Sequence, residues 1–171
     1  MKKVLIIRSA NDNTIDKLIN YIKIKEKNVQ IYMLLQQNLV DMYREKYLDV
    51  CFFEIRDVFF NYKKFKKNIR LKNQVNSVKY DVIYIPSSTN GFYQFEEIFL
   101  IASSLSAEKY YLFDSESNVK QINLKNKLIK FKNGINKILY IIKKLICIFI
   151  IILIYIFYYP YNRIKHDIKK Y

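Results

Sequence analysis

The sequence predicts an α/β fold in which a parallel five-stranded sheet with flanking helices is followed by a C-terminal transmembrane helix. Short apolar runs alternate along the first 115 residues with polar stretches whose apolar residues recur at helical spacing. The apolar runs are nearly continuous, which is typical of strands buried on both faces of a parallel sheet. A longer apolar segment lies near the C-terminus.

The predicted strands are rich in branched and aromatic residues, and each ends at polar or turn-forming residues. They are Val4–Ser9, Val29–Gln36, Val50–Ile55, Tyr80–Pro86 and Lys109–Asp114. A helical stretch lies in each connection, as parallel neighbours require. This rhythm predicts a Rossmann-like domain with helices on both faces of the sheet.

The first predicted helix has the clearest amphipathic pattern. It covers Thr14–Lys27, with Thr14 as the expected N-cap. Its apolar residues, Ile15, Leu18, Ile19 and Ile22, follow the i, i+3, i+4, i+7 spacing of one helix face. The further predicted helices are Asn38–Tyr47, Phe59–Ser77 and Phe92–Ala107.

The apolar segment near the C-terminus predicts a membrane helix. Leu145–Tyr159 is unbroken apolar or aromatic, and as a helix it measures about 22 Å. Extended upstream to Ile138 it measures about 33 Å, enough for a hydrocarbon core of roughly 30 Å. Lys143 and Lys144 would extend toward the head groups, and Pro160 would end the helix. A helix that enters the membrane without crossing it is the alternative.

These features divide the chain into a Rossmann-like domain (1–117), a basic linker (118–137), a membrane helix (138–160) and a basic tail (161–171). The segment after Asp114 has little periodicity and is either a strand remnant or an amphipathic linker. The net charge is +15. The first 115 residues hold 18 basic and 13 acidic residues, and the rest of the chain holds 12 basic and 2 acidic residues. The lysines before the apolar segment outnumber those after it. The sequence therefore predicts a single C-terminal anchor in the cytoplasmic membrane, with the N-terminal domain in the cytoplasm.

Three polar loops follow predicted strands: Ser9–Thr14, Pro86–Gly91 and Asp114–Ser117. In parallel sheets ligands bind beyond the carboxyl ends of the strands, where the strand order reverses. We therefore expect the first two loops to line a crevice for a polar ligand. The candidate substrate-binding residues are Ser9, Asn11, Asn13, Ser87, Ser88, Thr89, Asn90 and Gly91.

Few catalytic chemistries fit the remaining residues. Asp12 is the candidate catalytic base, and a role in starting the helix is its structural alternative. Gly91 and Gly134 are the only glycines, so a glycine-rich phosphate loop is excluded. His166 is the only histidine, which excludes a histidine-dependent triad or a histidine metal cluster. We expect no metal and no cofactor. Flavodoxin-like FMN binding is a minor alternative, because polar loops can hold a phosphate.

A basic stretch, Tyr62–Lys79, contains seven basic residues and no acidic residue. Beside a membrane anchor, such lysines fit contact with anionic lipid or with lipid phosphate, although a solvated helix face explains them equally well. Nucleic acid is not expected as a partner. The candidate contact residues are Lys63, Lys64, Lys66, Lys67 and Arg70.

Several short motifs resemble the N-terminal half of GT-B glycosyltransferases, and the heptosyltransferase-like families in particular. They are KKVLIIRS at the start of the chain, YDVIYIPSS at the fourth strand and AEKYYLFD at the fifth. The resemblance covers about residues 2–117. It implies an acceptor-binding half-domain, with the nucleotide-sugar bound by another half that does not follow here. Where the family usually has a Gly-Asp pair after the first strand, this chain has SANDN, so only Asp12 carries over.

The leading hypothesis is a membrane-anchored, glycosyltransferase-like half-domain in surface polysaccharide or glycolipid biosynthesis. It would bind the acceptor, or act as an accessory subunit, beside a soluble subunit that binds the nucleotide-sugar. Membrane lipid and a lipid-linked glycan acceptor would be its other partners. The alternatives are a non-enzymatic, membrane-tethered interaction domain and a flavodoxin-like FMN-binding protein.

Overall fold

A computed structural model describes residues 1–90, 92, 95–124, 140 and 142–156. The chain divides into two compact units, Met1–Ile129 and Lys130–Tyr171. The first unit is a mixed α/β domain, and the second contains a helix. Gly91, one of the predicted site residues, lies outside the described residues.

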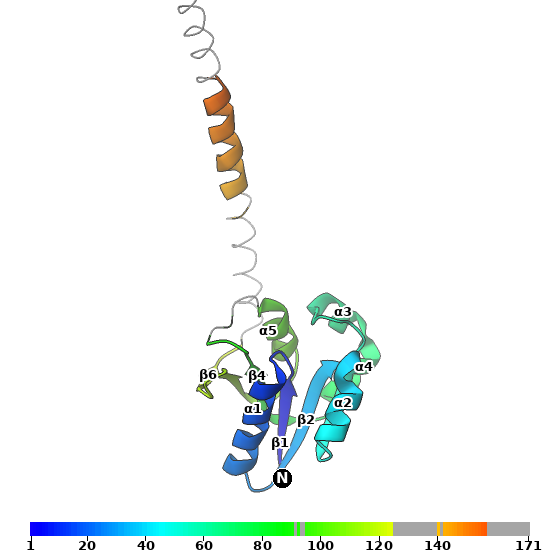
Figure 1. Ribbon diagram of the computed structural model, residues 1–171. Coiled ribbons are helices and arrows are strands. Elements are labelled where there is room, and N and C mark those ends of the chain that lie inside the picture. Colours follow the sequence, from blue (N-terminus) through cyan, green and yellow to red (C-terminus); the bar gives the residue numbers. More distant parts are fainter. Residues whose placement is uncertain (91, 93–94, 125–139, 141, 157–171) are drawn as a thin grey trace, which may run out of the picture. The chain divides into compact units, whose positions relative to one another are not determined.

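The first unit is built on a six-stranded sheet with the order β3-β2-β1-β4-β5-β6 (Figure 1). The strands are β1 (Lys2–Ile7), β2 (Val29–Gln36), β3 (Val50–Ile55), β4 (Tyr80–Pro86), β5 (Ala107–Phe113) and β6 (Val119–Ile122). The pairs from β3 to β5 are all parallel, and β6 runs antiparallel to β5. The strand order reverses between β1 and β4, as in Rossmann-like sheets.

The sixth strand corrects the prediction of a five-stranded, wholly parallel sheet. β6 lies in the segment that was expected to be a linker, beyond the predicted domain end at residue 117. A tight turn reverses the chain after β5, with Ser117 at a positive φ of 67°. The strand is only four residues long and reads VKQI, so neither its length nor its composition distinguishes it from a linker.

The helices of the first unit also differ from prediction in their boundaries. They are α1 (Asp12–Lys25), η1 (Gln37–Leu39), α2 (Val40–Lys46), α3 (Tyr62–Lys67), α4 (Ile69–Asn76) and α5 (Glu96–Ser103). The N-cap of α1 is Asn11 rather than Thr14, because the Asn11 side chain accepts a hydrogen bond from the Thr14 N–H at 3.0 Å.

The single helix predicted over Phe59–Ser77 is two helices separated at Asn68. Asn68 has φ −80° and ψ 79°, which is not helical. Its side-chain oxygen accepts a hydrogen bond from the Leu71 N–H at 3.1 Å and so caps α4. Asn side chains compete in this way with the helical hydrogen bonds of the backbone.

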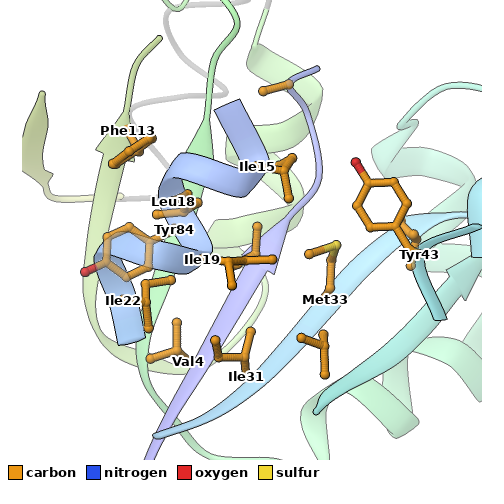
Figure 2. Packing of buried hydrophobic residues seen from close by; sticks show 14 of the residues in the cluster. Val4, Ile15, Leu18, Ile19, Ile22, Ile31, Met33, Tyr43, Tyr84 and Phe113 are labelled. Atoms are coloured by element: carbon orange, nitrogen blue, oxygen red, sulfur yellow. The ribbon is translucent and has the colours of Figure 1, made fainter. Parts of the chain in front are cut away.

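Each face of the sheet carries its own apolar core. On one face α1 and α2 cover β1, β2 and β4, and Figure 2 shows Ile15, Leu18, Ile19 and Ile22 of α1 turned toward the strands. These four side chains are at most 2% exposed, as their spacing predicted. On the other face α3, α4 and α5 contribute to a second core. Among the described residues, the members of both cores all lie within residues 1–124, inside the first unit.

The second unit is described at residue 140 and over residues 142–156, and all of these residues are helical. Its large apolar side chains are exposed, among them Phe149 at 62% and Ile151 at 64%. Within the described residues, no helix has both the length and the apolar character needed to span a bilayer. The predicted membrane helix (138–160) lies partly, and the predicted tail (161–171) wholly, outside the described residues.

Candidate functional site

The loops after β1 and β4 meet where the strand order reverses. The Ser9 hydroxyl donates to the Pro86 carbonyl at 2.6 Å, and the Asn11 N–H donates to the Ser88 hydroxyl at 2.7 Å. The structure thus brings together the two loops that the sequence singled out. Hydrogen bonds join the two loops directly.

The loop after β5 joins the same group. Asn90 donates a side-chain hydrogen bond to Glu116, and its oxygen accepts one from the Ser115 hydroxyl at 2.9 Å. Asp114 accepts hydrogen bonds from the N–H groups of Glu116 and Asn118, both at 2.9 Å. Burial opposes ionisation of Asp114, but these bonds and one from the Asn118 amide outweigh it, so the pKa of Asp114 is lowered. Asp114 therefore serves to build the turn.

Buried polar side chains concentrate along this edge of the sheet. The buried polar residues in the described part of the chain are Thr14, Gln36, Ser87 and Asp114. Extending the pairing register places Gln36, Ser9, Ser87 and Asp114 on successive strands at one level. Among the described residues, the side-chain oxygen of Gln36 has no hydrogen-bond partner. The carboxyl edge is thus polar across β2, β1, β4 and β5.

Asp12, the candidate base, belongs to a network with Arg8 and Tyr43. The Tyr43 hydroxyl donates to Asp12 Oδ1 at 2.5 Å and accepts from Arg8 Nε at 3.1 Å, while Arg8 Nη2 donates to Asp12 Oδ1 at 3.0 Å. Figure 2 shows the Tyr43 hydroxyl turned away from α2, toward the segment that joins β1 to α1. Tyr43 is 1% exposed, whereas the Asp12 side chain is 49% exposed.

The network sets the protonation of both groups. Hydrogen bonds from Tyr43 and then Arg8 lower the pKa of Asp12. Burial, and then the bond to Asp12, raise the pKa of Tyr43 to about 12. A general base works best when its pKa lies near the working pH, so a carboxylate held ionised in this way is a weak base. The geometry favours a positioning role for Asp12, which fixes α2 against the start of α1.

The other predicted loop residues have less distinctive surroundings. Asn13 is exposed in the first turn of α1. Ser87 and Thr89 have hydroxyls 3.2 Å apart, and the Thr89 N–H also approaches the Ser87 hydroxyl at 3.3 Å. These contacts are ordinary for a turn that contains hydroxyl side chains. The loop Pro86–Gly91 contains no charged residue.

A concave region beside the edge strand β3 was not predicted from the sequence. It is an open groove of about 710 Å³ between β3 and α4, which we call the β3–α4 groove. Phe52, Phe53 and Glu54 of β3, Arg56 just after β3 and Arg70 of α4 are among its lining residues. For Arg56, the only sign in the sequence of a role in this groove was its position directly after a predicted strand. Arg70 was predicted as a phosphate contact.

The remaining predicted phosphate contacts lie on α3. Lys63, Lys64, Lys66 and Lys67 are all exposed. Lys64 forms an ion pair with Asp57 at 2.5 Å, which holds the preceding loop against the helix. These lysines of α3 are therefore accessible to an anionic partner, but the same exposure is expected of lysines that only contact water.

Known proteins offer no guide to this chain. A scan against models of protein families, a search of curated proteins and a search of solved structures each found no match. Within the described residues, no group of three or more His, Cys, Asp or Glu side chains could hold a metal ion. The site must therefore be interpreted from its own geometry.

Proposed function

We propose that the chain is a membrane-anchored, glycosyltransferase-like half-domain that binds the acceptor, or acts as an accessory subunit, in surface polysaccharide or glycolipid assembly. The strand order that reverses at β1 and β4 supports a Rossmann-like domain. Many unrelated families share this order, so the link to glycan assembly depends on the sequence resemblance. In this proposal a separate soluble subunit brings the nucleotide-sugar.

The observation that carries the accessory role is the network around Asp12. The only candidate base is held ionised by Tyr43 and Arg8, and it fixes two helices relative to each other. A subunit that binds an acceptor needs no general base of its own. The hydrogen bonds between the loops of Ser9 and Ser88 also favour a stable binding platform at this edge of the sheet.

The proposed membrane attachment is supported by the second unit. Residues 142–156 form an apolar helix whose side chains are exposed, preceded in the sequence by a lysine-rich segment. An exposed apolar surface of this kind marks contact with lipid or with another protein. With the lysines on the cytoplasmic side, the α/β domain would work at the inner face of the membrane.

The test is to isolate the full chain from its native membrane in mild detergent after chemical cross-linking. Mass spectrometry should identify a soluble subunit that binds a nucleotide-sugar, and the pair should transfer sugar to a lipid-linked acceptor. The Asp12→Asn variant should retain transfer, and Asn20→Ala serves as an exposed control on the same helix. Loss of transfer in Asp12→Asn with normal stability would assign Asp12 a catalytic role. Absence of both a partner and transfer would refute the proposal.

A non-enzymatic, membrane-tethered interaction domain is the second candidate. The specific observation in its favour is that polar groups of the loops after β1, β4 and β5 bond to one another. This candidate predicts a cross-linked partner without any sugar transfer. Flavodoxin-like FMN binding is less well supported, because the Asn11 N–H that would face a phosphate already donates to Ser88.

A further inference from the structure

The β3–α4 groove presents two guanidinium groups that are not neutralised. Arg56 and Arg70 both line it and are exposed, and neither forms an ion pair within the described residues. Glu54 is the one carboxylate among the lining residues, and it is paired with Arg44 at 2.6 Å. The groove therefore carries a net positive field.

The lining is amphiphilic as well as cationic. Phe52 and Phe53 are half-buried, and the Phe53 ring stacks on Tyr32 with a centroid distance of 5.9 Å. Gln74, whose side chain offers both a donor and an acceptor, also lines the groove. Guanidinium groups in a groove that also has aromatic lining residues fit an anion attached to an apolar body.

The chain around the groove exposes large apolar side chains. Val58 is 69% exposed, Phe59 is 79% exposed and Ile69 is 69% exposed. Val58 lines a second hollow that shares Gln37, Glu54 and Arg56 with the groove, and Ile69 directly precedes Arg70. Apolar side chains exposed next to unpaired cations are typical of a surface that touches the membrane interface.

The loop that carries Val58 and Phe59 is held by its own contacts. The Asp57 carboxylate pairs with Lys64 at 2.5 Å, which leaves Lys63, Lys66 and Lys67 without an ion pair in the described part of the chain. After the loop, the Tyr62 N–H donates to Glu97 of α5 at 2.6 Å. A loop fixed at both ends presents its apolar tip at lower entropic cost than a free one.

We propose that the β3–α4 groove binds the terminal phosphate or diphosphate of a membrane lipid, with Val58, Phe59 and Ile69 in the head-group layer. Arg56 and Arg70 would each donate paired hydrogen bonds to phosphate oxygens, which an ammonium group cannot do. Lys63, Lys66 and Lys67 would hold the domain to the anionic surface through their charge. The inference rests on the proposed function for its biological ligand and deepens it, since an acceptor lipid that ends in a phosphate or diphosphate would be held by this groove instead of by the β1–β4 loops.

The test uses residues 1–129, a compact unit that contains the described members of both apolar cores, so that the C-terminal helix cannot supply the binding. Sedimentation would compare phosphatidylcholine vesicles that contain polyprenyl diphosphate, phosphatidic acid or phosphatidylglycerol at equal surface charge. The diphosphate and the phosphomonoester should bind at least about tenfold more tightly than the phosphodiester, which corresponds to about 1.4 kcal/mol. Equal binding to all three would overturn the proposal, because charge alone would then explain it.

Matched variants locate the site. Arg56→Gln with Arg70→Gln should remove the preference for terminal phosphate, whereas Lys27→Gln with Lys79→Gln, two exposed lysines before β2 and β4, should retain it. Arg56→Lys with Arg70→Lys keeps the charge and guards against misfolding. It should retain general attraction to anionic vesicles but lose most of the preference. An unchanged preference in both arginine pairs would refute the assignment.

Phe59→Ser tests the lipid part of the proposal. It should weaken binding to vesicles several-fold and leave the binding of soluble inorganic diphosphate unchanged. If inorganic diphosphate binds as tightly as the lipid and Phe59→Ser has no effect, the ligand is a free phosphate compound and the lipid assignment is wrong. The glycosyltransferase role fails separately, since lipid binding without sugar transfer would refute that role alone.

Discussion

Replacing Tyr43 with Phe should destabilise the α/β domain by about 2 kcal/mol. The change keeps the ring, which is 1% exposed, and removes only the hydroxyl that donates to Asp12 and accepts from Arg8. Hydrogen bonds to charged groups contribute roughly 1.5–3 kcal/mol each. The Asp12 side chain is 49% exposed, so water can replace much of the hydrogen bond that Tyr43 donates to it. The expected loss is therefore about the contribution of one such bond rather than two.

Urea unfolding of residues 1–129 would measure this loss, with Tyr21→Phe as the control. The Tyr21 hydroxyl accepts a hydrogen bond from the exposed Lys25, so its removal should change the free energy of unfolding by at most about 0.5 kcal/mol. A double-mutant cycle of Tyr43→Phe with Asp12→Asn should give a coupling of roughly 1 kcal/mol or more. If Tyr43→Phe is no more destabilising than Tyr21→Phe, the network does not hold α2 to α1.

The same network predicts a dependence of stability on pH. Because the pKa of Tyr43 is raised to about 12, against about 10 in the unfolded chain, its contribution is complete below pH 10 and is lost between about pH 10 and 12. The pKa of Asp12 is lowered, so its contribution is present above about pH 4 and is lost as the pH falls through the folded value. In Tyr43→Phe, the urea midpoint should therefore fall less between about pH 10 and pH 12 than it does in the unmodified protein. An identical alkaline profile in both proteins would contradict this reasoning.

Three further predictions follow from other features of the domain. Asn11→Ala removes the cap of α1 and should cost about 1 kcal/mol in thermal unfolding, whereas the neighbouring exposed Asn13→Ala should cost far less; equal costs would exclude the cap. Gln36→Leu replaces a buried oxygen without a partner in the described residues and should stabilise by about 1 kcal/mol, so a loss in urea unfolding would reveal an unseen partner. Deleting residues 138–171 should move the protein from the membrane to the soluble fraction at high salt, which screens the attraction of its basic residues to anionic lipid, in a fractionation assay; retention at high salt would contradict a single C-terminal anchor.

The parts of the fold that follow from local pattern were predictable from the sequence. The observed β2, β3 and β4 have the predicted bounds, since each is a largely apolar run with polar residues on either side. The buried face of α1 was also predictable, because apolar residues at the i, i+3, i+4, i+7 spacing lie on one side of a helix. β6 was not, because a short polar edge strand is defined by its pairing with β5 rather than by its own residues.

The candidate site was predictable only in its location. The loops after β1 and β4 were expected to meet because the carboxyl ends of parallel strands share one edge. The partner of Asp12 was not foreseen, since Tyr43 lies 31 residues away on a helix of unremarkable sequence. The β3–α4 groove also depends on tertiary placement, which brings Arg56 and Arg70 together from two elements. The number of basic residues identified the basic stretch, but it could not identify the β3–α4 groove.

The distribution of paired and unpaired charge separates the two regions in chemical terms. At the β1–β4 loops Arg8 and Asp12 neutralise each other, and the neutral polar groups bond across the loops. At the β3 edge Arg56, Arg70 and most of the α3 lysines have no acidic partner in the described residues. An anion gains most where cations are not already neutralised, because no existing ion pair must be broken. The unpaired cations of the β3 edge are therefore the better match for the phosphate that we propose as ligand, whereas the polar groups of the β1–β4 loops bond the loops to each other.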